Sequence, residues 1–379
     1  MRMCDTPGSA GSARRGPATF LDELAASVVA EGVAPVAAVG CGWLAHDGSL
    51  QLEGGGAKER VFDLASVTKM ATALAVARAG LEPTRELGDL LPELAESPSG
   101  KATLEQLLSH RAGLLGHVEL FAPLRDGAVG IDVAAALRRA AESRRPDCPG
   151  PVPAAGFPAV YSDLGYVLAG LALARHGGDL DAGAAAERLV ARPLDVLLGT
   201  VRGLGADGID YVPTELTVWR SPTPLRGIVH DENALALTGL GGSGHAGLFG
   251  TVAAVLVLGL EVLRMLQGQG PLACAAPPTW LVAPRAGATW RAGFDGKSAA
   301  GSSAGEFASA SSFGHLGFTG TSVWIDPKRR VVTCLLSNRV NPTRTNLAIK
   351  AARPRVHDAL FRHAASQREA RVVQYPAAP

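Results

Sequence analysis

The segment "FDLASVTKMATALAVARAG", residues 62–80, places a single lysine among mostly apolar residues. Its second half is apolar on nearly every face, which is typical of a buried helix. Burying an ammonium is costly unless the group is paired or loses its proton. Ser66 and Lys69 are three residues apart, so they share one face of the predicted helix. Two interpretations follow. Either Lys69 activates Ser66 as a nucleophile, or Ser66 caps the helix and Lys69 extends to solvent.

Strand-forming patterns occur near both ends of the chain. Residues 35–56 predict a β-hairpin around the turn dipeptide Asp47-Gly48. Residues 314–327 and 329–339 predict two further strands, joined by the turn "DPKR". The two C-terminal strands need a pairing partner, and the N-terminal hairpin is the obvious one. We therefore expect one antiparallel sheet built from both chain termini.

Helical patterns surround these strands. Residues 19–32 and 346–365 predict terminal helices that cover the sheet, the second of them interrupted at Pro354. The stretch between the two strand regions is mostly helical or irregular, with helices expected from Thr103, at 185–199 and after Phe249, and a small, polar, flexible tract at 296–313. The predicted fold class is α+β, an antiparallel sheet flanked by helices with an inserted, mostly helical lobe.

The same patterns predict the domain organisation. Residues 1–17 are expected to be a flexible N-terminal tail, and residues 18–368 one domain. Within that domain, segments 18–65 and 310–368 would form the α/β lobe, and residues 66–309 the helical lobe.

Composition narrows the class of protein. Hydrophobic residues make up 47% of the 379 residues and charged residues 19%, which is a globular composition. The net charge of +1 favours binding neither to nucleic acid nor to an anionic membrane. Five cysteines without a CxxC predict no disulfide framework, and Cys41 and Cys334 are expected to be core thiols in a reducing compartment. The apolar run at 248–266 is short for a membrane span, and no export signal is evident, so we expect a cytoplasmic protein.

Two further patterns carry reactive groups. Tyr161-Ser162-Asp163 opens a second very apolar helix, where a phenol beside a cation could carry a proton. His315 and Gly317 begin an apolar strand, where glycine allows a close approach of the backbone and a strand N–H could form part of an oxyanion hole. Taken alone, each pattern is better explained by an ordinary capped helix or a glycine-containing strand.

Taken in order, the three patterns resemble the serine β-lactamase and penicillin-binding-protein superfamily, most of all its class C-like branch, which includes esterases and DD-peptidases. Ser66-Val67-Thr68-Lys69 matches the Ser-x-x-Lys motif of that family, Tyr161-Ser162-Asp163 its Tyr-x-Asn motif, and His315-Leu316-Gly317 its Lys/His-Thr/Ser-Gly motif. The segments "LLSHRAGL", "GIVHDENALALTGLGGSGHAGLFG" and "LLSNRVNPTR" are also similar to that branch. The resemblance covers roughly residues 20–365.

The resemblance implies a mechanism. Ser66 would attack a carbonyl to form an acyl-enzyme, with Lys69 and Tyr161 moving the serine proton. The N–H groups of Ser66 and Phe318 would form the oxyanion hole, and His315 would support the electrostatics near Tyr161. Water would release the acid. The substrate would be a small ester or amide, with no metal and no cofactor, and the sequence makes no prediction of oligomeric state.

Two departures from the family motifs bear on the substrate. Asp163 stands where Asn is usual, which removes an amide donor and adds a possible negative charge. Leu316 replaces the Thr or Ser whose hydroxyl helps such enzymes hold a substrate carboxylate. Both departures, and the expected location, favour an ester or a non-peptidoglycan amide. The alternatives are DD-carboxypeptidase or β-lactamase activity, or a weakly catalytic sensor on the same fold.

Other motifs predict less. His230, Asp231, Asn233 and His245 lie in a Gly-rich segment and are expected mainly to fix loop geometry. The Gly-x-Ser-x-Gly at 301–305 lacks the strand and helix of a nucleophile elbow. The sequence "DGKS" lacks the first glycine of a P-loop. The histidines form no HxH or HxxxH pair, so the sequence predicts no metal site.

Overall fold

The computed structural model describes residues 18–45 and 47–374, so the predicted tail at 1–17 lies outside the described residues. The strands are β1 Ala37–Leu44, β2 Leu50–Gly56, β3 Phe62–Asp63, β4 Leu198–Gly199, β5 Phe249–Gly250, β6 Asp295–Gly296, β7 Phe313–Leu316, β8 Ser322–Asp326 and β9 Val331–Ser337. The helices are α1 Phe20–Ala30, α2 Thr68–Arg78, α3 Leu87–Leu90, α4 Leu104–Leu108, α5 Ala122–Arg125, α6 Val133–Glu142, α7 Asp163–Gly177, α8 Ala182–Ala186, α9 Arg192–Leu194, α10 Val201–Leu204, α11 Glu232–Thr238, α12 Val252–Met265 and α13 Ile349–Gln374. Single turns are η1 Ala65–Val67, η2 Pro92–Leu94, η3 Glu187–Ala191 and η4 Thr279–Leu281.

A six-stranded antiparallel sheet joins the two ends of the chain, in the order β2-β1-β9-β8-β7-β6. The predicted pairing of the N-terminal hairpin with the C-terminal strands is confirmed, because β1 pairs with β9 from Ala37↔Ser337 to Trp43↔Val331. A second, three-stranded sheet has the order β3-β5-β4. The α+β fold class expected from the sequence is therefore correct.

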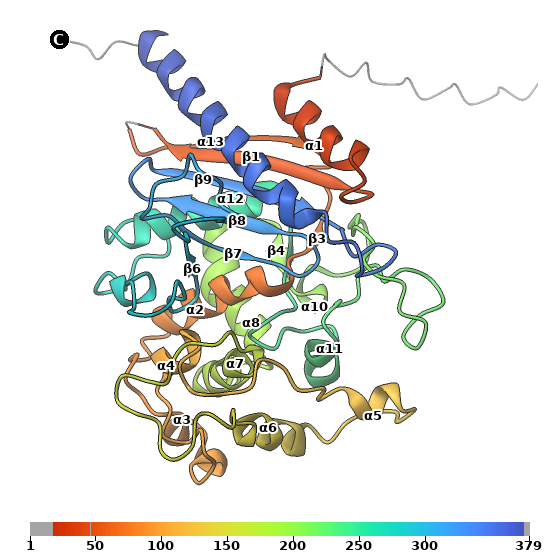
Figure 1. The fold of residues 1–379 in the computed structure, drawn as a ribbon, viewed down its shortest axis with the longest axis vertical. Coiled ribbons are helices and arrows are strands. Elements are labelled where there is room, and N and C mark those ends of the chain that lie inside the picture. Colours follow the sequence, from red (N-terminus) through yellow and green to blue (C-terminus); the bar gives the residue numbers. More distant parts are fainter. Residues whose placement is uncertain (1–17, 46, 375–379) are drawn as a thin grey trace, which may run out of the picture.

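Helices cover both faces of the larger sheet. α1 and α13 pack on one face, and α12 packs on the other, against β1 and β9 (Figure 1). Every residue of β1 is buried, since this strand lies between two helical layers. The helices α2, α7 and α8 pack on one another below the sheet and hold the start of α2 near β7.

Three local predictions were wrong. Pro354 does not interrupt the last helix: it lies in the second turn of α13, where it removes only one backbone donor, and the helix continues along β9. The strand predicted at 314–327 is two strands, β7 and β8, because Gly317 and Gly320 form a turn between them. The helix predicted at 185–199 is broken into α8, η3 and α9.

The tract 296–313 has little regular structure, but it packs against the sheet and α13. Ala304 and Ala308 are buried there beside residues of α13. The Phe307 N–H donates to the carboxylate of Asp358, and the Ser309 N–H donates to that of Asp326. The sequence predicts a flexible tract from its small side chains, but in the structure these side chains allow the tract to pack closely against α13. In the described part of the chain, no helix combines the length and the hydrophobicity needed to cross a bilayer.

Candidate active site

Ser66 lies in a strained turn between β3 and α2. The preceding residue, Ala65, has a φ of 47°, a region that residues other than glycine rarely enter. The buried carboxylate of Asp63 accepts hydrogen bonds from the Ala65 N–H (2.8 Å) and from the His230 N–H (2.8 Å). Asp63 thus fixes the backbone conformation that presents Ser66 to a cavity at the start of the helix.

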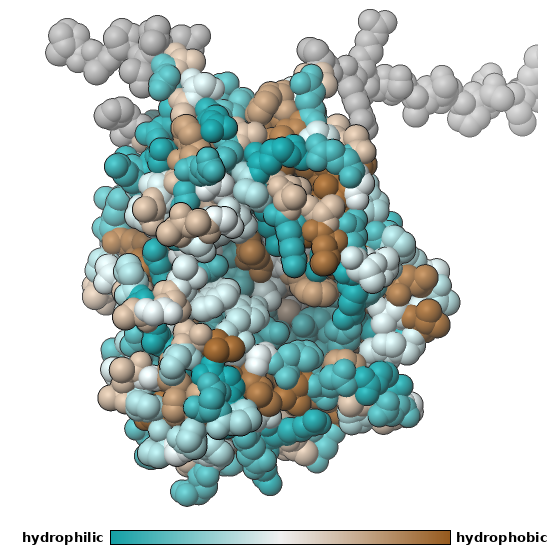
Figure 2. Space-filling view, viewed as in Figure 1, coloured by the Kyte–Doolittle hydropathy of each residue, from teal (hydrophilic) through white to brown (hydrophobic). Residues whose placement is uncertain are grey.

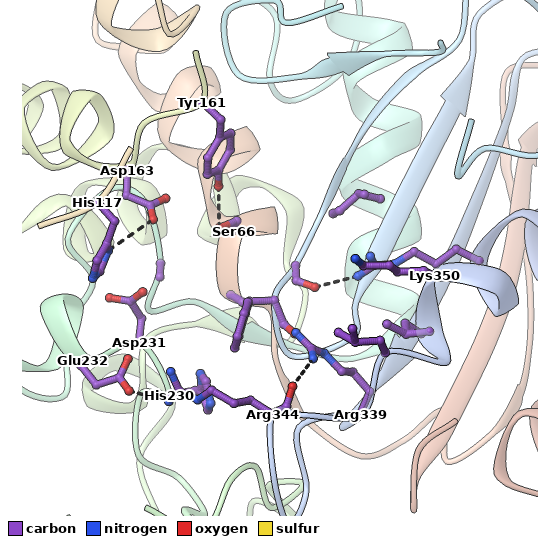
Figure 3. A pocket seen from close by; sticks show the side chains of 18 of the residues that line it. Ser66, His117, Tyr161, Asp163, His230, Asp231, Glu232, Arg339, Arg344 and Lys350 are labelled. Carbon is purple, nitrogen blue, oxygen red and sulfur yellow. Dashed lines mark hydrogen bonds and ion pairs between the residues drawn. The ribbon is translucent and has the colours of Figure 1, made fainter. Parts of the chain in front are cut away.

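The Ser66 hydroxyl contacts both side chains that the sequence motifs associate with it. Lys69 Nζ lies 3.0 Å from Ser66 Oγ, and the Tyr161 hydroxyl donates to the same oxygen at 2.9 Å. Tyr161 precedes α7, and its ring points at Ser66 (Figure 3). Lys69 Nζ also lies 5.0 Å from the centre of the Tyr161 ring. This arrangement can move a proton between the serine, the amine and the phenol.

Lys69 is fully buried and surrounded by oxygen atoms. Besides Ser66 Oγ, its Nζ contacts Asp163 Oδ1 at 2.7 Å and the carbonyl oxygen of His245 at 3.1 Å. Burial lowers the pKa of Lys69, and the carboxylate of Asp163 opposes part of that effect. Burial also raises the pKa of Asp163, but Lys69 and His245 outweigh it and hold that pKa below its usual range. Lys69 and Asp163 therefore form a buried ion pair directly beside Ser66.

Aromatic and imidazole rings surround Tyr161. The rings of His110, Trp290 and His315 lie with their centres 4.7, 5.0 and 6.3 Å from that of Tyr161. Burial and the nearby Lys69 lower the pKa of both His110 and His315 to about 3, so both rings are neutral near pH 7. Burial and Asp163 raise the pKa of Tyr161 well above its usual value. Tyr161 is therefore a neutral phenol in the resting protein, able to donate a proton.

The turn between β7 and β8 closes the other side of Ser66. A Cβ at Gly317 would lie 2.6 Å from the Leu64 carbonyl oxygen, so glycine is required for this close approach. The hydroxyls of Thr319 and Thr321 donate to the carbonyl oxygens of Asp63 and Leu64. The turn is thus attached to the backbone that precedes Ser66. Within the described residues the Phe318 N–H has no hydrogen-bond acceptor, which leaves it available to a ligand.

Ser66 opens into a cavity of about 590 Å³ between the sheet and the helices. The space-filling view shows that this face of the molecule is hollowed between the sheet and the helices below it (Figure 2). Figure 3 shows Asp163 and Asp231 on one side and Lys350 on the other, and Arg344 reaches Glu232. The lining residues are Ala65, Ser66, His117, Glu119, Phe121, Tyr161, Asp163, His230, Asp231, Glu232, Ala246, Leu316, Gly317, Phe318, Arg339, Arg344, Leu347, Ile349, Lys350 and Arg353.

The cationic wall of the cavity consists of Arg339, Arg344, Lys350 and Arg353, and among the described residues only Arg344 has a carboxylate partner. Arg344 pairs with Glu215 and Glu232. Lys350, at the start of α13, forms no ion pair with any described residue. Arg353 is only 8% exposed and donates to the carbonyl oxygens of Gly317 and Thr321, but no acceptor faces its Nε among the described residues. A buried, unpaired guanidinium is costly, so this wall is suited to an anionic group of a ligand.

The structure brings together most of the residues selected from the sequence. Ser66, Tyr161, Asp163, Leu316, Gly317 and Phe318 line the cavity, and Lys69 lies directly behind Ser66. His315 does not line the cavity. Its side chain lies behind Tyr161, with Nδ1 2.9 Å from the Leu316 carbonyl oxygen.

The Gly-rich segment has two roles. Asn233 fixes the loop at 118–121 by binding the N–H groups of Leu120 and Phe121 and the carbonyl of Val118. His245 forms a 2.8 Å contact with Asp231, and that carboxylate together with His230 faces the cavity. The prediction of mainly structural roles thus agrees with the contacts of Asn233 and His245, whereas Asp231 and His230 also contribute to the cavity wall.

Sequence reasoning missed several residues of the site. His110 contacts Tyr161, and its Nδ1 accepts a hydrogen bond from the Ser162 N–H. It lies within the quoted segment "LLSHRAGL", which was the one available signal. The cationic wall had no comparable signal, because arginine and lysine in a C-terminal helix are usually solvated.

Comparisons with known proteins identify the family and the fold. The sequence model of the beta-lactamase family matches residues 21–356. An Escherichia coli (strain K12) protein named "Putative D-alanyl-D-alanine carboxypeptidase" is 28% identical over 316 residues, 74% of this chain and 69% of that protein. A penicillin-binding protein homologue from Caulobacter crescentus has a similar fold, with a TM-score of 0.63 at 20% identity over 92% of this chain and 99% of that one. A family VIII carboxylesterase gives a TM-score of 0.63 at 19% identity over the same shares. Because the family model matches most of the chain, this chain is a member of the beta-lactamase family.

Proposed function

We propose that the protein is a serine hydrolase that cleaves an ester, and less readily an amide, through an acyl-enzyme on Ser66. One observation carries this proposal. Ser66 Oγ lies within hydrogen-bond distance of both Lys69 Nζ (3.0 Å) and the Tyr161 hydroxyl (2.9 Å), at the wall of a cavity large enough for a small substrate.

The reaction would proceed in two steps. In the molecules whose Lys69 has lost its proton, Ser66 Oγ attacks the substrate carbonyl while its proton passes to the Lys69 amine, and Tyr161 donates a proton to the leaving group. The Ser66 N–H, in the first turn of the helix, and the Phe318 N–H, which has no acceptor among the described residues, stabilise the oxyanion. Water then attacks the acyl-enzyme, and the same groups return the protons. His315 keeps the space behind Tyr161 filled with a neutral ring.

The two departures from the family motifs support an ester as the preferred substrate. Leu316 lines the cavity and offers no hydroxyl to a substrate carboxylate. Asp163 is committed to Lys69 at 2.7 Å, so it cannot donate to a substrate amide as Asn would. An ester needs less help than an amide, because an alkoxide is a better leaving group than an amide anion.

A DD-carboxypeptidase or β-lactamase activity is the second candidate, and one observation favours it. Lys350 and the buried Arg353 supply positive charge on the cavity wall that no described carboxylate neutralises. Substrates of both classes carry a carboxylate, which would suit this wall. A carboxylate-bearing ester would satisfy both the Ser66 chemistry and the cationic wall.

The proposal is tested by hydrolysis of p-nitrophenyl butyrate and by labelling with a fluorophosphonate, read out by intact-protein mass spectrometry. We expect wild type to turn over the ester and to gain one label, and Ser66→Ala to lose both. Ser27→Ala, in α1 and away from the cavity, is the matched control and should behave as wild type.

Two results would contradict the proposal. Turnover retained by Ser66→Ala would exclude Ser66 as the nucleophile. A wild-type protein that neither labels nor hydrolyses esters, penicillins or D-alanyl-D-alanine peptides would instead favour a ligand-binding sensor on the same fold.

A further inference from the structure

Three side chains suited to metal binding meet at the β2 edge of the larger sheet, away from the Ser66 cavity. Cys41 in β1 and Glu53 in β2 are directly opposite each other in the antiparallel register, so they share a face of the sheet. His363 of α13 lies over that face. The thiol sulfur, a carboxylate oxygen and an imidazole nitrogen all lie within 4.8 Å of one another.

Neighbouring groups hold these three side chains in place. His363 Nε2 lies 2.7 Å from Glu53 Oε2, and the Phe20 ring of α1 stacks on the imidazole with centres 5.0 Å apart. Cys41 is fully buried, while the side chains of Glu53 and His363 are 28% and 15% exposed. Restricted ligands of this kind lose little conformational entropy on binding.

Two of the three side chains, Glu53 and His363, are accessible from solvent, and Cys41 lies behind them. A cavity of about 430 Å³ is lined by Glu53 and His363, together with Phe20 of α1 and Gln367 of α13. An ion could therefore approach the carboxylate and the imidazole first and reach the buried thiol behind them.

The types of donor atom in Cys41, Glu53 and His363 indicate which metal would bind. One sulfur, one nitrogen and one oxygen donor are typical of zinc sites, whereas magnesium and calcium require oxygen ligands. Ligand atoms around a tetrahedral zinc ion lie about 3.5 Å apart, so the three tips would need to move by about 1 Å. We propose that Cys41, Glu53 and His363 bind one Zn²⁺ ion, with a solvent molecule as the fourth ligand. The Cys41 S–H bond breaks, an S–Zn bond forms and the proton passes to solvent, with no change of oxidation state.

The position of the site predicts its effect. β1, β2 and α13 would be joined by one ion at the β2 edge, whereas Ser66 lies near β7 at the other side of the sheet. The ion would therefore stabilise the association of the two chain ends, since metal binding to the folded protein contributes directly to its stability. It would take no part in ester hydrolysis.

Titration of the metal-free, full-length protein with Co²⁺ tests the proposal. We expect a thiolate-to-cobalt charge-transfer absorption in the near ultraviolet that saturates at one equivalent and disappears when Zn²⁺ is added. His363→Ala should weaken cobalt binding by more than about 100-fold. Loss of a residue that only hydrogen-bonds to a metal ligand already lowers metal affinity by about 10–100-fold, and loss of a ligand should cost more. Zn²⁺ should raise the melting temperature of wild type and leave that of His363→Ala unchanged.

Two cysteine variants test whether the absorption comes from the thiolate of Cys41. Cys41→Ser should abolish the absorption, and Cys274→Ser, which removes a half-buried thiol elsewhere, should leave it intact. If Cys41→Ser fails to fold, Glu53→Gln and His363→Ala change partly exposed side chains and serve in its place. The proposal is overturned by the lack of an absorption at stoichiometric cobalt. It is equally overturned by an absorption that survives His363→Ala or is lost in Cys274→Ser.

Discussion

Replacing Asp163 by Asn should move the acid limb of the pH–rate profile for ester hydrolysis to lower pH. Lys69 must be neutral to accept the Ser66 proton, and the Asp163 carboxylate, 2.7 Å from Lys69 Nζ, stabilises the charged form. Removing that charge lowers the pKa of Lys69. A larger fraction of the enzyme then carries the neutral amine at a given pH below the limb, so activity persists further into acid.

The distance sets the size of the effect. Two unit charges 2.7 Å apart attract by about 6 kcal/mol at an effective dielectric constant of about 20. At about 1.4 kcal/mol per pKa unit, this is an upper limit of roughly 4 units. The Asn oxygen still accepts from Lys69, and Asp231 still favours the ammonium. We therefore expect a shift of about 1–3 units, the usual effect of one neighbouring opposite charge.

The assay is kcat/KM for p-nitrophenyl butyrate between about pH 5 and 9, which reports the ionisation of the free enzyme. Glu119→Gln is the matched control: it removes one carboxylate from the same cavity wall, but that side chain is 51% exposed and pairs with Arg125 rather than Lys69. Its acid limb should stay within about 0.3 units of wild type. An acid limb that is unmoved, or raised, in Asp163→Asn would show that ionisation of Lys69 does not limit the reaction.

Three further predictions concern the cavity wall. Leu316→Thr should raise the rate of penicillin acylation by about tenfold or more, because a hydrogen bond to a charged group contributes about 1.5–3 kcal/mol; an equal or lower rate in stopped-flow acylation would exclude Leu316 as the cause of weak recognition. Gly317→Ala should lower the free energy of unfolding by about 1–3 kcal/mol, because its Cβ would meet the Leu64 carbonyl oxygen; a urea midpoint equal to that of wild type would refute the need for glycine. Lys350→Gln should raise KM about tenfold for an ester with a carboxylate and leave a neutral ester unchanged; equal effects on both esters would show that Lys350 does not bind the anion.

The sequence predicts those site residues whose positions depend only on residues nearby in the chain. Ser66 and Lys69 are one helical turn apart, so their contact follows from local spacing alone, and Tyr161 opens a helix whose apolar pattern predicts its burial. The pairing of N-terminal with C-terminal strands could be predicted because only four strand patterns were evident, and each had few possible partners.

The parts that sequence reasoning missed depend on distant segments or on detailed packing. Arg353 faces the cavity because of how α13 crosses the sheet, and nothing in its own segment indicates that its guanidinium would be buried without a carboxylate. Cys41, Glu53 and His363 come from two strands and a helix, so no short motif could reveal them, and Cys41 was predicted only as a core thiol. The turn that separates β7 from β8 was missed because its glycines were interpreted as part of one strand.

The pairing of β1 with β9 has a consequence for synthesis of the protein. Ala37 leaves the ribosome about 300 residues before its partner, Ser337; at a typical elongation rate of 5–20 residues per second this takes roughly 15–60 seconds. During that interval the β1–β2 hairpin has an unpaired, fully apolar edge, which is a template for aggregation. Ser66, Lys69 and Tyr161 are already synthesised, but the β7–β8 turn that completes their site is not. The nascent chain should therefore depend on chaperones, and it should acquire esterase activity only after its last strand is released.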